Sequence, residues 1–148
     1  MNRIRIMERV VLPSHLIEQM VAQACASPQA EICGLVTARN GHPSRCIAVR
    51  NVAPQPQRLF SMDPQQQIDA MRSMREQGEQ LYGIYHSHPQ GPAEPSATDL
   101  AQAAYPEALY FIVSLNRDRE PLLQGYRIRN GGAEQVQLVT DPADAQSG

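Results

Sequence analysis

The sequence predicts a single α/β domain built from layers of helices and strands. Two stretches carry apolar residues at the spacing of an amphipathic helix, and several short apolar runs have the length of strands. Gly, Pro, Asn and Asp residues separate these segments, as expected for turns and helix ends. A chain of 148 residues can bury roughly 68–70 per cent of its unfolded surface, so one core suffices without disulfides or a structural metal.

The N-terminal part predicts one helix followed by two strands. Ser14 is expected to cap the helix, which runs to about Ala26. Its apolar residues form one stripe: Leu16, Ile17, Met20, Val21 and Ala24. Residues 31–38 and 45–52 then predict a pair of strands that are joined through Asn40-Gly41, a typical hairpin turn.

A second helix follows an irregular connection. Residues 51–62 contain Pro and Gln and have no periodic pattern. Asp63-Pro64 combines a capping residue with a proline suited to the first turn, so a helix should begin there and end near Gly78. We expect its methionines to pack into the core.

The C-terminal part predicts three more strands. Residues 109–115 form a buried apolar run, and residues 122–129 pair with residues 134–139 across the turn at 130–132, Asn-Gly-Gly.

The most informative stretch lies at the end of another predicted strand. An apolar run at 81–85 leads directly into His86 and His88, and side chains two apart on a strand project from the same face. The residues that follow forbid regular structure: Pro89, Gly91, Pro92 and Pro95. A helix then begins at Ser96, which places Asp99 in its first turn. Two imidazoles and one carboxylate can therefore converge on one point.

Three protein ligands are typical of a catalytic zinc site, because the fourth position stays open for water or substrate. Zinc lowers the pKa of bound water to about 7, but a base must still accept the proton, and Glu31 is the candidate. Taken alone, Ser96-x-x-Asp99 is an ordinary helix N-terminus, and isolated histidines such as His15 and His42 are typical structural residues. The joint occurrence of all these features favours a metal site.

These motifs closely resemble the JAMM (MPN-plus) metalloprotease family. The resemblance rests on His86-Ser87-His88-Pro89, Pro95-Ser96 and Asp99, together with the upstream run Glu-Ile-Cys-Gly-Leu at 31–35. It extends over nearly the whole chain, from about residue 10 to 138.

The resemblance implies a mixed, curved sheet flanked by helices, an architecture similar to that of cytidine deaminases. The MPN domain is expected to span residues 1–140, followed by a flexible tail at 141–148.

The resemblance also implies a role for each motif residue. His86, His88 and Asp99 would bind one Zn²⁺ per chain. Glu31 would act as the general base, and Ser96 would support the oxyanion. Ser87, on the opposite face of the strand, is expected to orient neighbouring backbone.

The implied activity is that of a zinc metallopeptidase or isopeptidase. The compact chain is similar to the minimal prokaryotic form of the family, which is associated with bonds after the C-terminal Gly-Gly tail of ubiquitin-like or sulfur-carrier proteins. Two alternatives stay open: another endopeptidase of the family, acting on cell walls or in phage tails, and a non-catalytic MPN scaffold. A zinc nucleobase deaminase is set aside, because its His-x-Glu and Pro-Cys-x-x-Cys signatures are missing.

Composition narrows the partners and the location. A net charge of -2 and a pI near 6.1 lack the excess of positive charge that is typical of nucleic-acid-binding proteins. No stretch is apolar for long enough to cross a bilayer, and the N-terminus lacks a signal-peptide core, so a cytoplasmic protein is expected. Cys25, Cys33 and Cys46 lack CxxC spacing and are expected to be reduced, with Cys33 packed in the core rather than bound to metal. A homodimer is left open.

Overall fold

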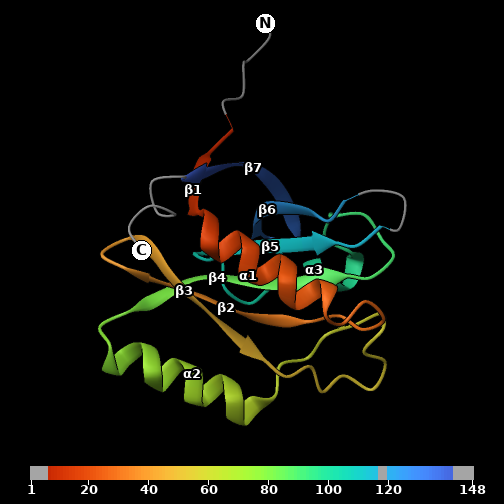
Figure 1. The fold of residues 1–148 in the computed structure, drawn as a ribbon, viewed down its shortest axis with the longest axis horizontal. Helices are drawn as coiled ribbons and strands as arrows, with labels where there is room; N and C mark the ends of the chain where they lie inside the picture. Colours follow the sequence, from red (N-terminus) through yellow and green to blue (C-terminus); the bar gives the residue numbers. More distant parts are fainter. Residues whose placement is uncertain (1–6, 117–119, 142–148) are drawn as a thin grey trace, which may run out of the picture.

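Seven strands and three helices make up the computed structural model, which describes residues 7–116 and 120–141 (Figure 1). The strands are β1 (Arg9–Pro13), β2 (Cys33–Arg39), β3 (His42–Val49), β4 (Gln80–His88), β5 (Leu109–Ser114), β6 (Leu122–Arg129) and β7 (Gly132–Asp141). The helices are α1 (Ser14–Cys25), α2 (Pro64–Glu76) and α3 (Ala97–Gln102). None of these helices combines the length and the apolar character that a membrane crossing requires.

All the strands belong to one sheet with the order β1-β7-β6-β5-β4-β2-β3. The pairs β1–β7 and β4–β5 are parallel, and the remaining pairs are antiparallel. The sheet is therefore mixed, which confirms the expected fold class. The strand that carries both motif histidines, β4, lies inside the sheet, so hydrogen bonds on both sides fix its position.

The two long helices cover opposite faces of the sheet. Alternate residues of β5 divide between two cores: Phe111 packs in the same cluster as Leu16 and Met20 of α1, whereas Ile112 packs in the cluster that contains Met74 of α2. In Figure 1, α1 crosses the sheet near its centre and α2 lies beyond β2 and β3. The predicted stripe of α1 is confirmed, because Leu16, Met20 and Ala24 are buried and Ile17 and Val21 pack against the same core.

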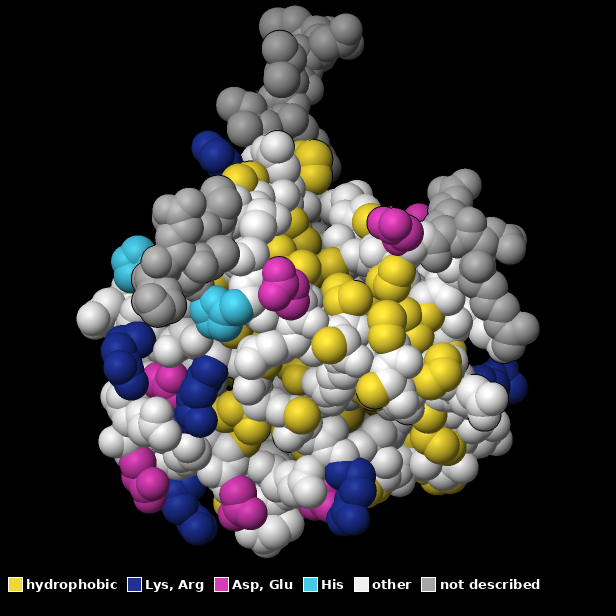
Figure 2. Space-filling model, in the orientation of Figure 1, with side chains coloured by type: hydrophobic (Ala, Val, Ile, Leu, Met, Phe, Trp, Pro, Cys, Tyr) yellow, Lys and Arg dark blue, Asp and Glu magenta, His cyan; other side chains and the backbone are white. Residues whose placement is uncertain are grey.

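The surface over α1 is chemically mixed. Figure 2 shows hydrophobic side chains toward the centre of this face and basic and acidic side chains interspersed around its margin. The described side chains of this face therefore combine both signs of charge.

Both predicted hairpin turns are confirmed. Asn40 and Gly41 have φ angles of 53° and 79°, and Asn130 and Gly131 have φ angles of 53° and 74°. Two consecutive residues with positive φ form the turn whose twist matches that of the flanking strands, and Asn-Gly adopts it at low cost. The turns set the register of β2 with β3 and of β6 with β7.

The predicted start of α2 is also confirmed. The side chain of Asp63 accepts hydrogen bonds from the backbone N–H groups of Gln65 (2.9 Å) and Gln66 (3.3 Å), and Pro64 occupies the first helical position. Met74 is buried, as expected, whereas Ile68 on the outer face of the helix is 54% exposed.

The N-terminus differs from the prediction. Ser14 is already helical, and the capping position belongs to Pro13, which has no side-chain hydrogen bond. The reason is that the chain passes directly from a strand into α1. That strand, β1, pairs with the distant β7, and no local sequence signal predicted it.

Several predicted boundaries also move. Glu31 and Ile32 precede β2, and β3 begins and ends three residues earlier than expected. Asp141, expected in the flexible tail, pairs with Pro13 at the end of β7. Residues 142–148 of that tail lie outside the described residues.

A buried carboxylate secures the far end of β2. Glu79 accepts hydrogen bonds from Thr37 Oγ1 (2.9 Å) and Arg45 Nε (2.9 Å), where the register of β2 shifts between Val36 and Thr37. Burial raises the pKa of Glu79, but the hydrogen bonds from Arg45 and Thr37 outweigh this effect, so the pKa lies below its usual value.

Glu79→Gln should lower the free energy of unfolding at neutral pH by about 1.5–3 kcal/mol, because Arg45 loses its charged partner. The pKa of Glu79 is lower in the folded state. The stabilisation is therefore present above an unfolded pKa near 4.5 and is lost as the pH falls through the folded value. Urea unfolding as a function of pH checks this, with the exposed Glu76→Gln as the control. A difference between Glu79→Gln and wild type that stays constant into acid would contradict the account.

Candidate functional site

The two motif histidines lie at the end of β4 and point to the same side. Their Nε2 atoms are 3.1 Å apart, and both rings are buried. His88 Nδ1 lies 2.8 Å from the backbone carbonyl of Pro92, to which it donates, so the Nε2 lone pair faces His86. Phe60 stacks on the His86 ring with centroids 4.4 Å apart and so restricts its orientation.

Asp99 completes the group from the first turn of α3. Its Oδ2 lies 3.1 Å from the Nε2 atoms of both histidines. Ser96 fixes this carboxylate through a capping box, in which Ser96 N donates to Asp99 Oδ2 (2.9 Å) and Asp99 N donates to Ser96 Oγ (3.0 Å). The helix cap therefore also orients the carboxylate.

These three atoms form a triangle with equal sides of 3.1 Å. Two neutral imidazole nitrogens that face each other with their lone pairs would repel each other unless a cation or proton lay between them. Ligand atoms about 2.0–2.1 Å from a tetrahedral zinc ion are about 3.3 Å apart, close to the sides of this triangle. The donor set and its spacing therefore fit a divalent metal ion.

Glu31 reaches this group through the pairing of β2 with β4. Ser87, between the histidines, accepts a hydrogen bond at Oγ from Ile32 N (2.9 Å), and Ser87 N donates to Ile32 O (3.0 Å). These bonds confirm that Ser87 orients neighbouring backbone. They fix the residue next to Glu31 and bridge 55 positions of sequence.

The Glu31 carboxylate is buried beside the histidines. It is 6% exposed, and potential ligand atoms of Glu31, His86 and His88 lie within 4.8 Å of one another. Glu31 Oε1 has no hydrogen-bond partner among the described residues. A buried carboxylate oxygen without a partner is costly, and a water molecule or an ion would satisfy it.

Burial changes the protonation of these groups. Desolvation, together with the nearby Asp99 charge, raises the pKa of Glu31 to about 7, although His88 opposes the shift. Desolvation also lowers the pKa of His86, which favours the neutral ring that a metal requires. Burial would raise the pKa of Asp99, but the close polar contacts with His86 and His88 outweigh it and favour the ionised carboxylate.

Gly34 shows why the motif around Glu31 contains a glycine. A Cβ atom at Gly34 would lie 2.3 Å from the ring of Tyr85 and 2.6 Å from the carbonyl oxygen of Ile47. Tyr85 is buried across Gly34, and its hydroxyl donates to Gln23 (2.6 Å). The missing side chain therefore allows β2 and β4 to pack closely beside the site.

The connection between β3 and α2, which had no predicted role, forms one wall of the site. Asn51 Nδ2 donates to the carbonyls of Glu31 (3.0 Å) and Leu59 (2.9 Å), and its Oδ1 accepts from Ala53 N and Ser61 N. No periodic signal marks such a segment, because its order comes from one side chain that satisfies several backbone groups.

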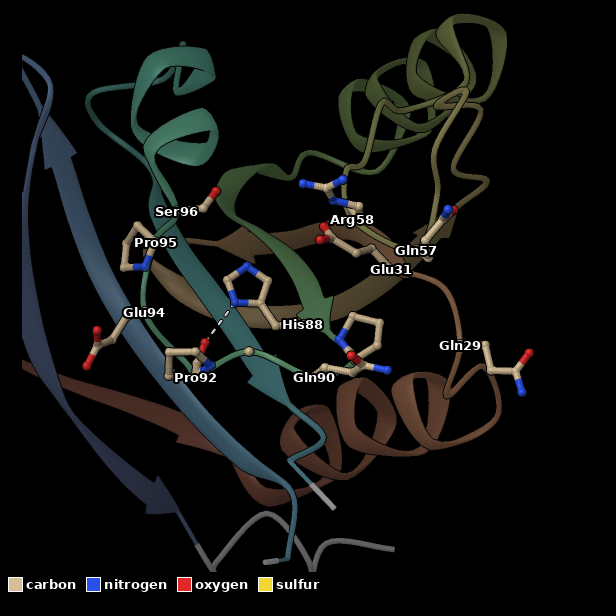
Figure 3. A pocket seen from close by; sticks show the side chains of 12 residues that line it. Gln29, Glu31, Gln57, Arg58, His88, Gln90, Pro92, Glu94, Pro95 and Ser96 are labelled. Carbon is tan, nitrogen blue, oxygen red and sulfur yellow. Dashed lines mark hydrogen bonds between the residues drawn. The ribbon is translucent and has the colours of Figure 1, made fainter. Parts of the chain in front are cut away.

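A cleft of about 550 Å³ opens beside Glu31 and His88 (Figure 3). His88 lies near its middle, with Glu31, Gln57 and Arg58 on one side and Glu94, Pro95 and Ser96 on the other. The structure thus brings the five predicted site residues together: Glu31, His88 and Ser96 line the cleft, and His86 and Asp99 contact His88. His15 and His42 do not line the cleft.

Cys33 behaves as a core residue. It is fully buried, its thiol donates to the carbonyl of Val49 (3.3 Å), and burial raises the pKa of the thiol to about 12. Cys25 and Cys46 are also free thiols, as expected.

Comparisons with known proteins agree with this geometry. The family model described as prokaryotic homologs of the JAB domain matches residues 13–127. The CysO-cysteine peptidase of Mycobacterium tuberculosis is 33% identical over 134 residues, which cover 88% of this chain and 91% of the relative. The desampylase of Haloferax volcanii is 34% identical over 98 residues, which cover 62% of this chain and 67% of the relative.

A solved structure supports the same relationship. The solution structure of a protein from Desulfitobacterium hafniense superimposes with a TM-score of 0.77 at 32% sequence identity and covers 88% of this chain and 92% of that one. The expected architecture and the expected class of enzyme, a JAMM-type hydrolase of peptide or isopeptide bonds, are confirmed. The chain belongs to the prokaryotic family of JAB domains, the MPN or JAMM fold that its motif indicated.

Proposed function

We propose that this protein is a zinc-dependent peptidase that cleaves after the C-terminal Gly-Gly tail of a ubiquitin-like or sulfur-carrier protein. His86, His88 and Asp99 would bind one zinc ion, Glu31 would act as the general base, and Ser96 would support the oxyanion. The triangle of donor atoms with 3.1 Å sides, next to the buried Glu31, is the observation that carries the proposal.

The protein side chains then have distinct tasks. A zinc ion bound in the triangle would supply Lewis-acid polarisation of the scissile carbonyl and would acidify water. Glu31 accepts a proton from the attacking water and returns it to the leaving nitrogen. Burial favours the protonated form of Glu31, and a carboxylate placed in this way can take up a proton and release it again.

Ser96 has a hydroxyl hydrogen available for the reaction. Its Oγ accepts the hydrogen bond from Asp99 N with one lone pair, and the O–H group can still donate. Ser96 lines the cleft across from Glu31. A donor placed there can stabilise negative charge on the carbonyl oxygen in the transition state.

The substrate class follows from the relatives. They are named as a CysO-cysteine peptidase and a desampylase, and both names indicate cleavage of conjugates of ubiquitin-like or sulfur-carrier proteins. A narrow Gly-Gly tail would leave room for backbone contacts in the cleft. A cell-wall or phage-tail endopeptidase and an MPN scaffold are the alternatives that activity measurements separate. A cytoplasmic location and a homodimer stay predictions.

The metal set can be tested directly by zinc binding. Asp99→Asn should weaken zinc binding by about 100-fold or more, because a ligand matters at least as much as its supporting shell. Glu31→Gln should keep one equivalent of zinc. Competition with a chromogenic chelator, together with metal analysis, measures both variants. Loss of zinc from Glu31→Gln but not from Asp99→Asn would contradict this ligand set and would indicate that Glu31 and the two histidines bind the ion.

Activity tests the enzyme itself. The zinc-loaded protein should cleave a fusion with a Gly-Gly junction, a chelator should stop the reaction, and added zinc should restore it. Glu31→Gln should lose about 10²- to 10⁴-fold in kcat/KM, because the amide that replaces the carboxylate cannot accept the proton. Glu18→Gln, on an exposed position of α1, is the matched control.

Two results would overturn this mechanism: cleavage that resists the chelator, and a Glu31→Gln variant as active as wild type. One equivalent of bound zinc without turnover of any junction would instead favour the scaffold.

A further inference from the structure

The wall of the cleft beside Glu31 carries an arginine, Arg58, on a hydrogen-bonded turn. Arg58 N and Leu59 N both donate to the carbonyl of Gln55, at 3.1 and 3.0 Å. Glu31 N donates to Pro56 O (2.7 Å), so the turn is fastened to the backbone of Glu31 itself. The position of Arg58 is therefore coupled to that of the proposed base.

The side chain of Arg58 faces the cleft rather than a protein partner. It lines the cleft together with Glu31 and lies on the same side of His88 (Figure 3). Its guanidinium has no hydrogen bond or ion pair among the described residues. Of the described side chains that line the cleft, Arg58 alone carries a permanent positive charge, whereas Glu31 and Glu94 are acidic. An anionic group of the substrate would be its natural partner.

The direction of proton transfer indicates which part of the substrate lies beside Arg58. The base that deprotonates water returns the proton to the leaving nitrogen, so the leaving group lies on the Glu31 side of the scissile carbonyl. In a residue that leaves as a free amino acid, the α-carboxylate is separated from that nitrogen by a single carbon. In an isopeptide, a chain of methylene groups separates the ε-nitrogen of lysine from its Cα, so no carboxylate lies close to that nitrogen. A cation beside Glu31 thus distinguishes the two leaving groups.

We propose that Arg58 binds the α-carboxylate of a leaving C-terminal residue, so that the preferred substrate is a carrier tail extended by one amino acid rather than an isopeptide to lysine. The inference rests on the proposed function and names the substrate class of the same site. Water adds its oxygen to the carbonyl carbon of the last glycine as the C–N bond breaks. One product is the carrier with a glycine carboxylate, and the other is an amino acid whose amine has gained the proton.

Binding without turnover tests the role of Arg58. The probes are two fluorescent peptides that end in Gly-Gly-Ala, one with a free carboxylate and one with a C-terminal amide. Alanine is chosen because no thiol can then reach the metal. Zinc-loaded Glu31→Gln serves as the non-cleaving protein, and fluorescence anisotropy gives Kd.

The free acid should bind about tenfold more tightly than the amide, as expected for a charge-assisted pair with arginine. Adding Arg58→Gln should bring the two affinities together, whereas adding Arg72→Gln, an exposed arginine of α2, should leave the preference intact. Equal affinity for both peptides in Glu31→Gln, including no measurable binding of either, overturns the inference. A preference that survives Arg58→Gln also overturns it, because the carboxylate is then bound elsewhere.

Turnover separates this inference from the proposed function. In the otherwise wild-type enzyme, Arg58→Gln should lower kcat/KM about tenfold for the Gly-Gly-Ala acid and leave an isopeptide to lysine unchanged. An equal loss on both substrates overturns the inference, since Arg58 would then act on the shared part of the substrate. If the binding preference depends on Arg58 but wild type cleaves neither substrate, carboxylate binding by Arg58 is supported and the proposed function fails.

Discussion

The pairing of β2 with β4 is the constraint on which the site depends. It places Cys33 opposite His86, and the two hydrogen bonds between Ile32 and Ser87 continue the pairing to the residue beside Glu31. A slip of one residue would turn the histidines to the other face of the sheet. Gly34 allows the close packing, and β5 fixes β4 from its other side. The base and the candidate ligands therefore meet through backbone geometry.

Polar side chains around the site form hydrogen bonds with the backbone, whereas a few polar atoms within the site lack ordinary partners. Asn51, Ser96 and Ser87 use their polar groups on backbone and so hold the loops around the cleft. In contrast, Glu31 Oε1 is buried and has no hydrogen-bond partner within the described part of the chain, and the ligand atoms of His86, His88 and Asp99 lie only 3.1 Å from one another. Such hydrogen-bonded surroundings can hold buried polar atoms in place even when those atoms lack a partner and so lower the stability of the fold. The unpaired and crowded atoms are thus the ones that the proposed function uses.

Local signals predicted most of the fold. The hairpin turn at Asn40, the cap at Asp63 and the first turn around Asp99 each depend on neighbouring residues, and all three are found in the structure. The edge strand β1 was missed because the strand with which it pairs, β7, lies at the other end of the chain.

The same distinction holds for the site. The spacing of the histidines and Asp99 predicted their convergence. The place of Glu31 followed from the family resemblance alone, since 55 positions separate Ile32 from the Ser87 side chain that holds it. The wall that carries Arg58 has no local pattern, because Asn51 orders it through contacts with several backbone groups. The most direct measurement is an anomalous-scattering map of crystals of the zinc-loaded protein. The account predicts one zinc ion about 2.0–2.1 Å from the Nε2 atoms of both histidines and bound by Asp99, with Glu31 outside the coordination shell. An ion bound by Glu31 in place of Asp99, or no ion between the histidines, would contradict it.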